Sequence, residues 1–405
     1  MKINIEKNDL NFNLDSLLTL GYRANNEKRN FLFISKCLGK HLMIKPEVCR
    51  LIGYALAYQV YKPTNFDITK IKDLIEYPYS SMSEECDKIY KNKIITNEST
   101  LVLGFAETAT GLGMAVASAI KDSYYITTTR EPIIDMKSCF DFEETHSHAT
   151  SHQCFLKDLS KLDSDRIILV DDEITTGNTM LNLIESLETN LPSKKRKYTV
   201  LSILDWRSVA QIQKFEDFKK EKGIDIEVKS LISGSIECND SRLFVENSEN
   251  KIDDTITTNY LNAFNRITHD TSKGNVQYLD CTGRFGVSEN DIENIENIAD
   301  TIYSQLKDFD DKKILVLGHG ENIYIPARIA TKFKNAEFKT TSRSPIYISD
   351  ENNYPIKEKH SFNDGDVKYF FYDKSFIEKY YDVVILFTET DLNIKLCENQ
   401  VTYKL

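Results

Sequence analysis

The sequence predicts an α/β protein built from two domains, each with a parallel sheet covered by helices. Between about residues 48 and 260, short apolar runs alternate with longer segments in which apolar residues recur with helical periodicity. This alternation is typical of buried parallel strands joined by amphipathic helices. A second alternation follows from about residue 289 to residue 387, and 405 residues are enough for two hydrophobic cores.

The first alternation defines the first predicted domain. Its elements are, in order, helix 49–60, strand 101–105, helix 111–120, strand 124–128, strand 167–170, helix 179–187, strand 198–204 and helix 208–222. Open parallel sheets bind ligands at the carboxyl ends of their strands. Gly104 and Asp171 stand at two such ends, so we expect a ligand there.

The second alternation defines the second predicted domain. Its elements are helix 289–306, strand 314–317, helix 323–333, a loop at 342–345 and strand 383–387. The stretch between the two alternations is polar and rich in turn-forming residues, which indicates a connection. We therefore predict a first domain at 1–240, a linker at 241–274 and a second domain at 275–405.

Three segments of the first domain have counterparts in the second, in the same order. Residues 101–107 (LVLGFAE) match 315–321 (LVLGHGE), 127–133 match 340–346, and 165–172 match 382–389. The matches indicate a duplicated unit, with chance similarity between two α/β domains as the alternative. We expect strands 314–317 and 383–387 to occupy the sheet positions of 101–104 and 167–170. The copy is degenerate, because Thr388 and Glu389 replace two aspartates.

Residues 166–179, RIILVDDEITTGNT, carry the strongest functional signal. An apolar strand leads into Asp171 and Asp172, then into a small hydroxyl-rich loop and the start of a helix. Backbone N–H groups and the dipole at a helix N-terminus favour a phosphate, and Gly177 lets the backbone approach it closely. Two carboxylates beside a phosphate suit vicinal ribose hydroxyls. The loop lacks the lysine of a nucleotide triphosphatase phosphate loop, and an ordinary strand–turn–helix capped by an aspartate is the alternative.

This motif resembles the phosphoribosyl pyrophosphate (PRPP) motif of type I phosphoribosyltransferases. Over nearly the whole chain, the sequence is similar to the orotate-like transferases encoded in bacterial tellurium-resistance and stress operons. The C-terminal domain of that family is named for a Thr-Arg-Ser-Pro motif, which here reads Ser342-Arg343-Ser344-Pro345. The resemblance implies a type I phosphoribosyltransferase-like sheet domain, with residues 1–95 as a hood or extension, followed by a second α/β domain. It also implies transfer of ribose 5-phosphate between PRPP and a nucleobase-like acceptor.

The resemblance suggests roles for individual residues. The 5′-phosphate would contact Thr175, Thr176, Gly177, Asn178 and Thr179, and the ribose would contact the catalytic carboxylates Asp171 and Asp172. The pyrophosphate would contact Ala106, Glu107, Thr108 and Arg130. Mg²⁺ is expected as the cofactor, held mainly through pyrophosphate, with Asp171 as the candidate protein ligand. A capping loop and a surface salt bridge are the structural alternatives at 105–108 and at Arg130.

The polar loop 141–154 holds three histidines, and its length fits a mobile lid. His146 and His148 are candidates for contacting pyrophosphate or moving a proton. Together with His152 they also have a metal-like spacing, which leaves a zinc site as the alternative.

In the second domain, Ser342, Arg343, Ser344 and Arg284 are candidates for an anion site, because hydroxyls and guanidinium groups bind anions. Structured turns are the alternative. We expect Arg343→Ala to reduce activity while leaving PRPP binding by the first domain largely intact.

Composition limits the other classes of function. A net charge of −11 argues against a general nucleic-acid binder. No apolar run is long enough to span a bilayer, and the polar N-terminus is unlike a signal peptide. The eight cysteines are scattered, which favours reduced thiols and a cytoplasmic protein. Its partners are then small molecules, PRPP and a base, with a homodimer or other operon-encoded proteins as candidates. A PRPP-sensing regulator and a scaffold remain the alternatives to an enzyme.

Overall fold

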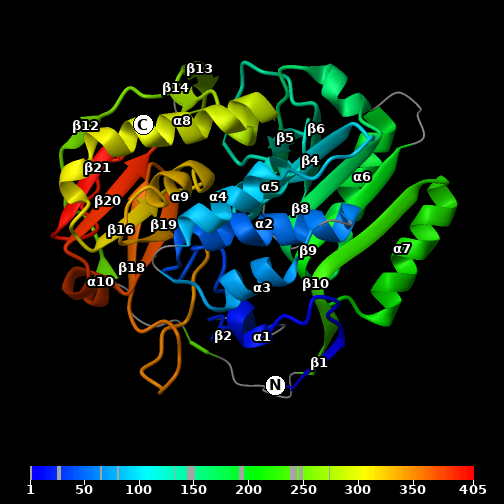
Figure 1. Ribbon diagram of the computed structural model, residues 1–405, viewed down its shortest axis with the longest axis horizontal. Coiled ribbons are helices and arrows are strands. Elements are labelled where there is room, and N and C mark those ends of the chain that lie inside the picture. The colour runs from blue at the N-terminus through cyan, green and yellow to red at the C-terminus, as the bar shows by residue number, and fades with distance from the viewer. Residues whose placement is uncertain are drawn as a thin grey trace.

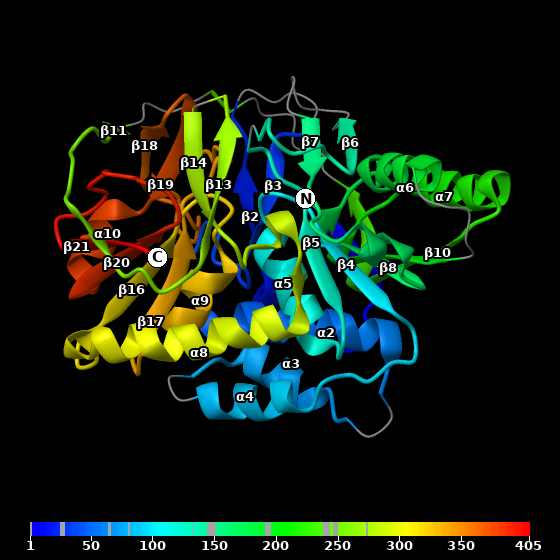
Figure 2. The ribbon, with the colours of Figure 1, turned by 90° about the horizontal axis from the view of Figure 1, so that it is seen from above.

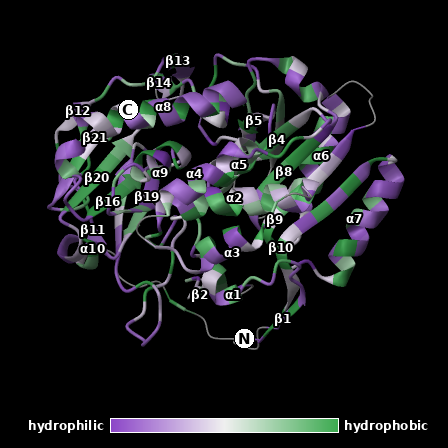
Figure 3. Ribbon diagram, viewed as in Figure 1, coloured by the Kyte–Doolittle hydropathy of each residue, from purple (hydrophilic) through white to green (hydrophobic). Residues whose placement is uncertain are grey.

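The computed structural model describes residues 2–24, 29–63, 66–79, 82–131, 133–143, 151–190, 196–237, 244–245, 250–272 and 274–405. Two sheets dominate the fold, the first on the right of Figure 1 and the second on the left. The central strands of both sheets are hydrophobic (Figure 3). One continuous cluster of buried side chains includes residues from both sheets, so the two halves share a core.

The first sheet has the strand order β1-β10-β9-β8-β4-β5-β15. Its strands are β1 (Lys2–Lys7), β4 (Thr100–Gly104), β5 (Tyr124–Thr127), β8 (Arg166–Ile174), β9 (Lys197–Asp205), β10 (Asp225–Glu237) and β15 (Val287–Ser288). Neighbouring strands from β10 to β5 are parallel, and the two edge strands are antiparallel. The predicted parallel sheet is confirmed. However, β8 continues beyond the predicted end at residue 170, because β9 is long enough to pair with it as far as Ile174.

The second sheet has the order β12-β21-β20-β16-β17, and all its pairs are parallel. Its strands are β12 (Thr258–Tyr260), β16 (Ile314–Gly318), β17 (Ala336–Thr340), β20 (Val383–Thr388) and β21 (Gln400–Lys404). Every residue of β16 and β20 is buried, as expected for central strands of a covered parallel sheet.

Two of the described helices begin at residues suited to that position. The described helices are α1 (Leu14–Leu17), α2 (Pro46–Tyr61), α3 (Thr69–Glu76), α4 (Ser83–Lys91), α5 (Ala109–Ala119), α6 (Asn178–Asn190), α7 (Val209–Lys222), α8 (Glu289–Gln305), α9 (Tyr324–Ala330) and α10 (Lys374–Tyr380). Ser208 and Ser288 form capping boxes at the starts of α7 and α8. Gly223 ends α7 with a φ of 65°. No helix in the described part of the chain has the length and apolarity needed to cross a membrane.

The stretch 241–274, expected to be a linker, contributes strands instead. β11 (Asn250–Lys251) pairs with β18 (Lys359–Asp364), and β12 pairs with β21. β13 (Arg266–Thr271) forms a hairpin with β14 (Gly274–Leu279). These strands carry few apolar side chains, because backbone pairing at the edge of a sheet does not require them. Their polarity therefore concealed them from an argument based on hydrophobic pattern.

Sheet order and register confirm the predicted duplication. The order β9-β8-β4-β5 in the first sheet corresponds to β21-β20-β16-β17 in the second. Gly104 lies opposite Thr127, and Gly318 lies opposite Thr340. Pairing of β4 with β8 and of β16 with β20 keeps the same register as well. We therefore refer to residues 2–237 as the first copy and residues 266–405 as the second copy.

The duplicated unit also includes two hairpins that sequence comparison did not detect. In the first copy they are β2 (Leu18–Tyr22) with β3 (Phe31–Ser35), and β6 (Phe140–Glu143) with β7 (Ser151–Cys154). In the second copy they are β13 with β14, and β18 with β19 (Val367–Tyr372). All four hairpins gather on one side of the molecule, with α2, α3, α4 and α8 on the opposite side (Figure 2).

The two copies exchange their N-terminal hairpin regions. After β3, Ile44 forms a two-way backbone bridge with Phe338 of the second copy. After β14, β15 of the second copy pairs with β5 of the first. The exchange buries two hydrophobic clusters, one containing Ile34 with Ile346 and the other containing Tyr278 with Ile133. Each copy therefore completes the core of the other.

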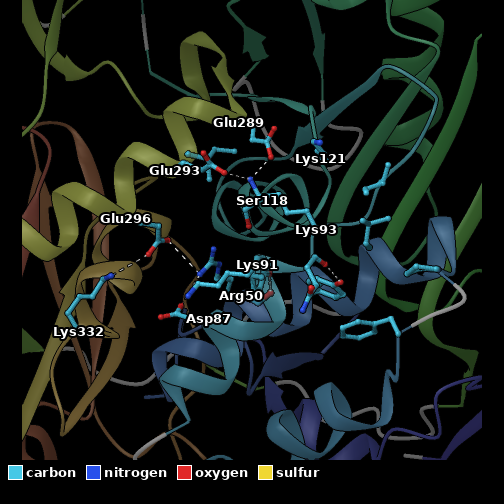
Figure 4. A pocket seen from close by; sticks show the side chains of 18 residues that line it. Arg50, Asp87, Lys91, Lys93, Ser118, Lys121, Glu289, Glu293, Glu296 and Lys332 are labelled. Carbon is cyan, nitrogen blue, oxygen red and sulfur yellow. Dashed lines mark hydrogen bonds and ion pairs between the residues drawn. The ribbon is translucent and has the colours of Figure 1, made fainter.

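A groove on the helical side of the molecule is crossed by ion pairs (Figure 4). Lys93 lies between Glu289 and Glu293, and Glu296 contacts the guanidinium groups of Arg50 and Arg328. Burial alone would raise the pKa of Glu296, but these two arginines outweigh it and lower that pKa to about 2. The carboxylate thus ties helices of both copies together.

Glu296→Gln is expected to lower the free energy of unfolding by about 2–3 kcal/mol at pH 7. A depressed folded-state pKa contributes stability that is fully present above the ordinary value of 4.5 and is lost as the pH falls toward 2. The difference between the wild type and this variant should therefore close over that range. Denaturant unfolding at several pH values measures it, with Glu293→Gln as a more exposed control. A difference that does not change with pH would contradict the assignment.

Candidate functional site

A cavity of about 270 Å³ lies at the carboxyl ends of β4, β5 and β8. It is lined by Lys40, Phe105, Ala106, Glu107, Thr108, Arg130, Asp171, Asp172, Thr179, Arg343 and Ser344. The structure thus joins the acid pair, the loop after β4 and Arg130, which the sequence analysis assigned to one site. It adds two residues from the second copy, so this cavity lies between the copies. Among its lining residues, Lys40 was not singled out from the sequence.

The acid pair lies within the last part of β8 and is half-buried. Asp171 Oδ1 accepts a hydrogen bond from the Asp172 backbone N–H at 2.9 Å. The next residue, Glu173, is also half-buried but contacts Arg29 instead, with 2.5 Å between Oε1 and Nη2. Burial raises the pKa of Glu173 despite this contact. The acidic run therefore divides into two carboxylates at the cavity and one that holds the segment before β3.

The loop from Thr175 to the start of α6 has the form expected for a phosphate-binding turn. Gly177 has a φ of 72°, and a Cβ there would overlap the ring of Phe215. The Asn178 N–H lies 3.4 Å from the Thr176 hydroxyl, and the Asn178 side chain accepts a hydrogen bond from Lys214. Of this loop, Thr179 lines the cavity. Thr175, Thr176, Gly177 and Asn178 form the turn that precedes Thr179 and are not among the lining residues.

The loop after β4 places a carboxylate and a hydroxyl at the cavity. The Ala106 N–H donates to the Thr128 hydroxyl at 2.9 Å, which fixes the loop. Lys40 Nζ donates to the Thr108 hydroxyl at 2.5 Å and lies 4.0 Å from Glu107 Oε2. Glu107 Oε1 is buried without a hydrogen-bond partner. A cation or a donor on a ligand would satisfy this oxygen.

Arg130 is oriented by a chain of hydrogen bonds behind it. Its guanidinium group donates to His152 Nε2 at 3.3–3.4 Å, and His152 Nδ1 lies 3.0 Å from the Thr128 hydroxyl. Both ring nitrogens of His152 thus have protein partners, which argues against this histidine as a zinc ligand. His146 and His148 lie outside the described residues.

Arg343 reaches the cavity from the second copy, at the position equivalent to Arg130. Its guanidinium group donates to the Tyr369 hydroxyl at 2.8 and 3.0 Å and forms an ion pair with Glu131 at 3.5 Å. Burial alone would lower the pKa of Arg343, but Tyr369 and Glu107 raise it overall. The cavity therefore receives two guanidinium groups, one from each copy, in addition to the ammonium group of Lys40.

A second cavity of about 490 Å³ occupies the equivalent place in the second copy. There Arg284 donates to Glu321 at 3.0 Å and to Glu389 at 3.0 and 3.2 Å. Glu321 and Glu389 are the counterparts of Glu107 and Asp172 in the repeat. Because Arg284 is held between two carboxylates, it is not positioned to bind an anion.

The four residues expected to form a second-domain anion site therefore do not form one site. Arg343 and Ser344 line the first cavity, and Arg284 lines the second. Ser342 is buried, and its hydroxyl contacts His41 and the Ser344 N–H. The reason is the packing of the two copies, which places Arg343 and Ser344 in the same cavity as Asp171.

The lining residues of the first cavity include carboxylates of the kind that bind Mg²⁺. Within the described ranges, no group of three or more His, Cys, Asp or Glu side chains could hold a metal ion alone. Glu107 and the acid pair nevertheless supply carboxylate oxygens at the cavity, one of them without a partner. Mg²⁺ commonly binds through one or two carboxylates together with substrate phosphates.

Solved phosphoribosyltransferases have low similarity to this chain. Adenine phosphoribosyltransferase from Trypanosoma brucei, in complex with AMP, pyrophosphate and ribose-5-phosphate, is 15% identical, with 53% of this chain and 76% of that chain covered and a TM-score of 0.31. The Rhodothermus marinus adenine enzyme is 11% identical, with 54% and 96% covered and a TM-score of 0.28. Orotate phosphoribosyltransferase from Mycobacterium tuberculosis, in complex with PRPP, is 12% identical, with 44% and 87% covered and a TM-score of 0.20. A search of curated proteins finds no match.

Family models match both copies. The model described as phosphoribosyl transferase matches residues 17–235, which is more than half of the chain. The model described as the TRSP domain C-terminal to that transferase domain matches residues 281–402. The first match contains the acid pair, Arg130 and the loop after β4, and the second contains Arg284 and Arg343. The chain belongs to the phosphoribosyl transferase family and carries its C-terminal TRSP domain.

Proposed function

We propose that the protein is a Mg²⁺-dependent phosphoribosyltransferase that transfers ribose 5-phosphate from PRPP to a nucleobase-like acceptor and releases pyrophosphate, or catalyses the reverse reaction. The observation that carries this proposal is the first cavity. It combines two carboxylates, the start of a helix after a glycine turn, and guanidinium groups from two directions. This set matches the three parts of PRPP in chemistry, namely the 5′-phosphate, the ribose hydroxyls and the pyrophosphate.

Each part of PRPP has a partner in this assignment. The 5′-phosphate lies at the N-terminus of α6, where backbone N–H groups and the helix dipole favour an anion. The ribose hydroxyls donate to Asp171 and Asp172. The pyrophosphate lies near Arg130, Arg343 and Lys40, since guanidinium and ammonium groups bind phosphate oxygens.

The reaction breaks the bond between C1 of the ribose and a pyrophosphate oxygen, which keeps the electron pair. A ring nitrogen of the acceptor attacks C1, where positive charge develops as the bond breaks, and the proton on that nitrogen is lost to solvent or to the departing pyrophosphate. Asp171 and Asp172 stabilise that charge, and the basic side chains stabilise the negative charge on the leaving group. Mg²⁺, when bound with pyrophosphate, would neutralise part of the same charge. Walls from both copies would limit the access of water, which would otherwise compete with the acceptor.

The test is to incubate the protein with PRPP, Mg²⁺ and a panel of nucleobases and to measure pyrophosphate release. Release that depends on one base supports the enzyme and identifies its acceptor. Binding of PRPP by calorimetry without turnover on any base would instead support a PRPP-sensing regulator. Absence of PRPP binding would contradict both the enzyme and the regulator and would leave a scaffold role. Omitting Mg²⁺ from each assay tests the cofactor.

We also propose a cytoplasmic location and a role in nucleotide metabolism under stress, including resistance to tellurium compounds. The support is the sequence similarity to transferases of stress operons and the scattered cysteines. Growth of a deletion strain with tellurite, with and without the intact gene, measures the contribution.

A further inference from the structure

A carboxylate of the second copy holds the segment that follows β5 in the first copy. Glu321 Oε1 accepts a hydrogen bond from the Arg130 backbone N–H at 3.0 Å. Glu321 Oε2 accepts one from the Thr129 hydroxyl at 2.8 Å. The Glu321 side chain is only 6% exposed, and Arg284 lies against it at 3.0 Å. The segment that carries a cavity-lining arginine is thus attached to the other half of the molecule.

The contact has a weaker counterpart related by the duplication. Glu107 of the first copy, equivalent to Glu321, lies 3.5 Å from the Arg343 backbone N–H. Each glutamate therefore faces the arginine of the opposite copy. The two glutamates differ in their other contacts. Glu107 lines the first cavity, whereas Glu321 is neutralised by Arg284 and its oxygens are directed to Thr129 and Arg130.

Burial alone would raise the pKa of Glu321, but Arg284 and the donors on Arg130 and Thr129 lower it overall. An ionised carboxylate makes stronger hydrogen bonds to N–H and O–H donors than a neutral acceptor does. The geometry therefore supplies a strong, two-point attachment at Thr129 and Arg130, just after the end of β5.

We propose that Glu321 is a positioning residue, through which the second copy sets the placement of Arg130 against the pyrophosphate end of the substrate. The inference rests on the proposed function, because it assigns pyrophosphate to the Arg130 side of the first cavity. A guanidinium group binds a pyrophosphate well only when its fork is aligned, and errors of about 1 Å in placement are costly. His152 orients the end of the side chain, and Glu321 fixes the backbone from which that side chain starts.

Glu389 offers a matched control for the loss of a buried ion pair. It lies against the same Arg284 at 3.0 Å and is 8% exposed at its side chain. Its other contact is the Leu279 backbone N–H, in the hairpin of the second copy. Removing either glutamate leaves Arg284 with one carboxylate partner. Of the two, only Glu321 contacts Arg130.

The experiment compares Glu321→Ala with Glu389→Ala by calorimetric binding of PRPP and of inorganic pyrophosphate with Mg²⁺. We expect Glu321→Ala to weaken pyrophosphate binding about tenfold and Glu389→Ala to weaken it less than about twofold. The KM for the acceptor base should stay unchanged in both. Glu321→Gln, which keeps an acceptor for the Arg130 N–H, should recover most of the affinity. Thermal unfolding of each variant records the loss of stability. If an alanine variant fails to fold, Glu321→Gln and Glu389→Gln replace the pair. In that pair only Glu321→Gln should lose measurable pyrophosphate affinity, by less than the loss expected for Glu321→Ala.

Equal losses of pyrophosphate affinity in the two variants, following their losses of stability, would show that Glu321 is only a structural residue. A loss confined to the KM of the base would overturn the proposal as well. Wild-type protein that binds neither PRPP nor pyrophosphate would instead overturn the proposed function, and the positioning role with it. Binding of PRPP and pyrophosphate by the wild-type protein therefore distinguishes failure of the positioning role from failure of the proposed function.

Discussion

Replacing Asp171 and Asp172 together by Asn is expected to weaken PRPP binding and to lower turnover, each by at least ~10-fold. Asparagine keeps the size of the side chain but removes both negative charges from the place where positive charge develops on the ribose. The fold should survive, because both side chains are half-buried at the cavity and the strand pairs through its backbone.

Calorimetric binding of PRPP and a turnover assay measure the two effects. Glu389→Gln is the control, because Glu389 occupies the position equivalent to Asp172 in the second copy and lies in the other cavity. That variant should keep PRPP binding and turnover near the wild-type values. Unchanged PRPP affinity in the double variant would contradict the assignment of Asp171 and Asp172 to the PRPP site.

Arg343→Ala is expected to lower turnover about 30-fold, because a hydrogen-bonded charge at the leaving group contributes roughly 2 kcal/mol. From the sequence, Arg343 was assigned to a separate site in the second domain, so its replacement was expected to leave PRPP binding largely intact. The structure places it in the same cavity as Asp171 and Arg130, so we now expect PRPP binding to weaken too.

Arg343→Lys should recover part of the loss, since lysine keeps the charge but lacks the planar fork that contacts Tyr369. Tyr369→Phe keeps the ring beside the guanidinium group and removes the hydroxyl, so a smaller loss is expected. Initial rates at varied PRPP concentration separate KM from kcat for each variant. Wild-type kinetics in Arg343→Ala would show that the second copy does not take part in the reaction.

Local sequence patterns were sufficient for the elements that carry their own signal. The run from Ile167 to Val170 is apolar and short, and the helix after Gly177 has apolar residues at helical spacing, so the start of each element was predicted to within one residue. The motif also located the acid pair correctly at the end of a central strand. Such features depend on neighbours within a few residues, which a single sequence displays directly.

Features that depend on distant contacts were missed for a physical reason. Lys40 meets Thr108 across 68 residues, and nothing near Lys40 indicates that partner. The polar strands β12 and β13 are held by backbone pairing, which leaves little trace in side-chain character. Once the hairpins are seen to be equivalent, Lys40 and Arg284 share the pattern Cys-x-Gly-Lys/Arg, with Cys37 and Cys281 three residues earlier. That signal was present in the sequence but too short to stand out.

Joining the two copies in one chain fixes their stoichiometry at one to one. A pair of separate subunits would associate according to their concentrations, whereas a tether supplies each half with its partner at a constant, roughly millimolar effective concentration. Because Ile44 and β15 cross between the halves, each half would expose unpaired strand edges on its own. The halves are therefore free to become chemically unlike, since a half with an acid pair always meets a half with Arg284 and never a second copy of itself.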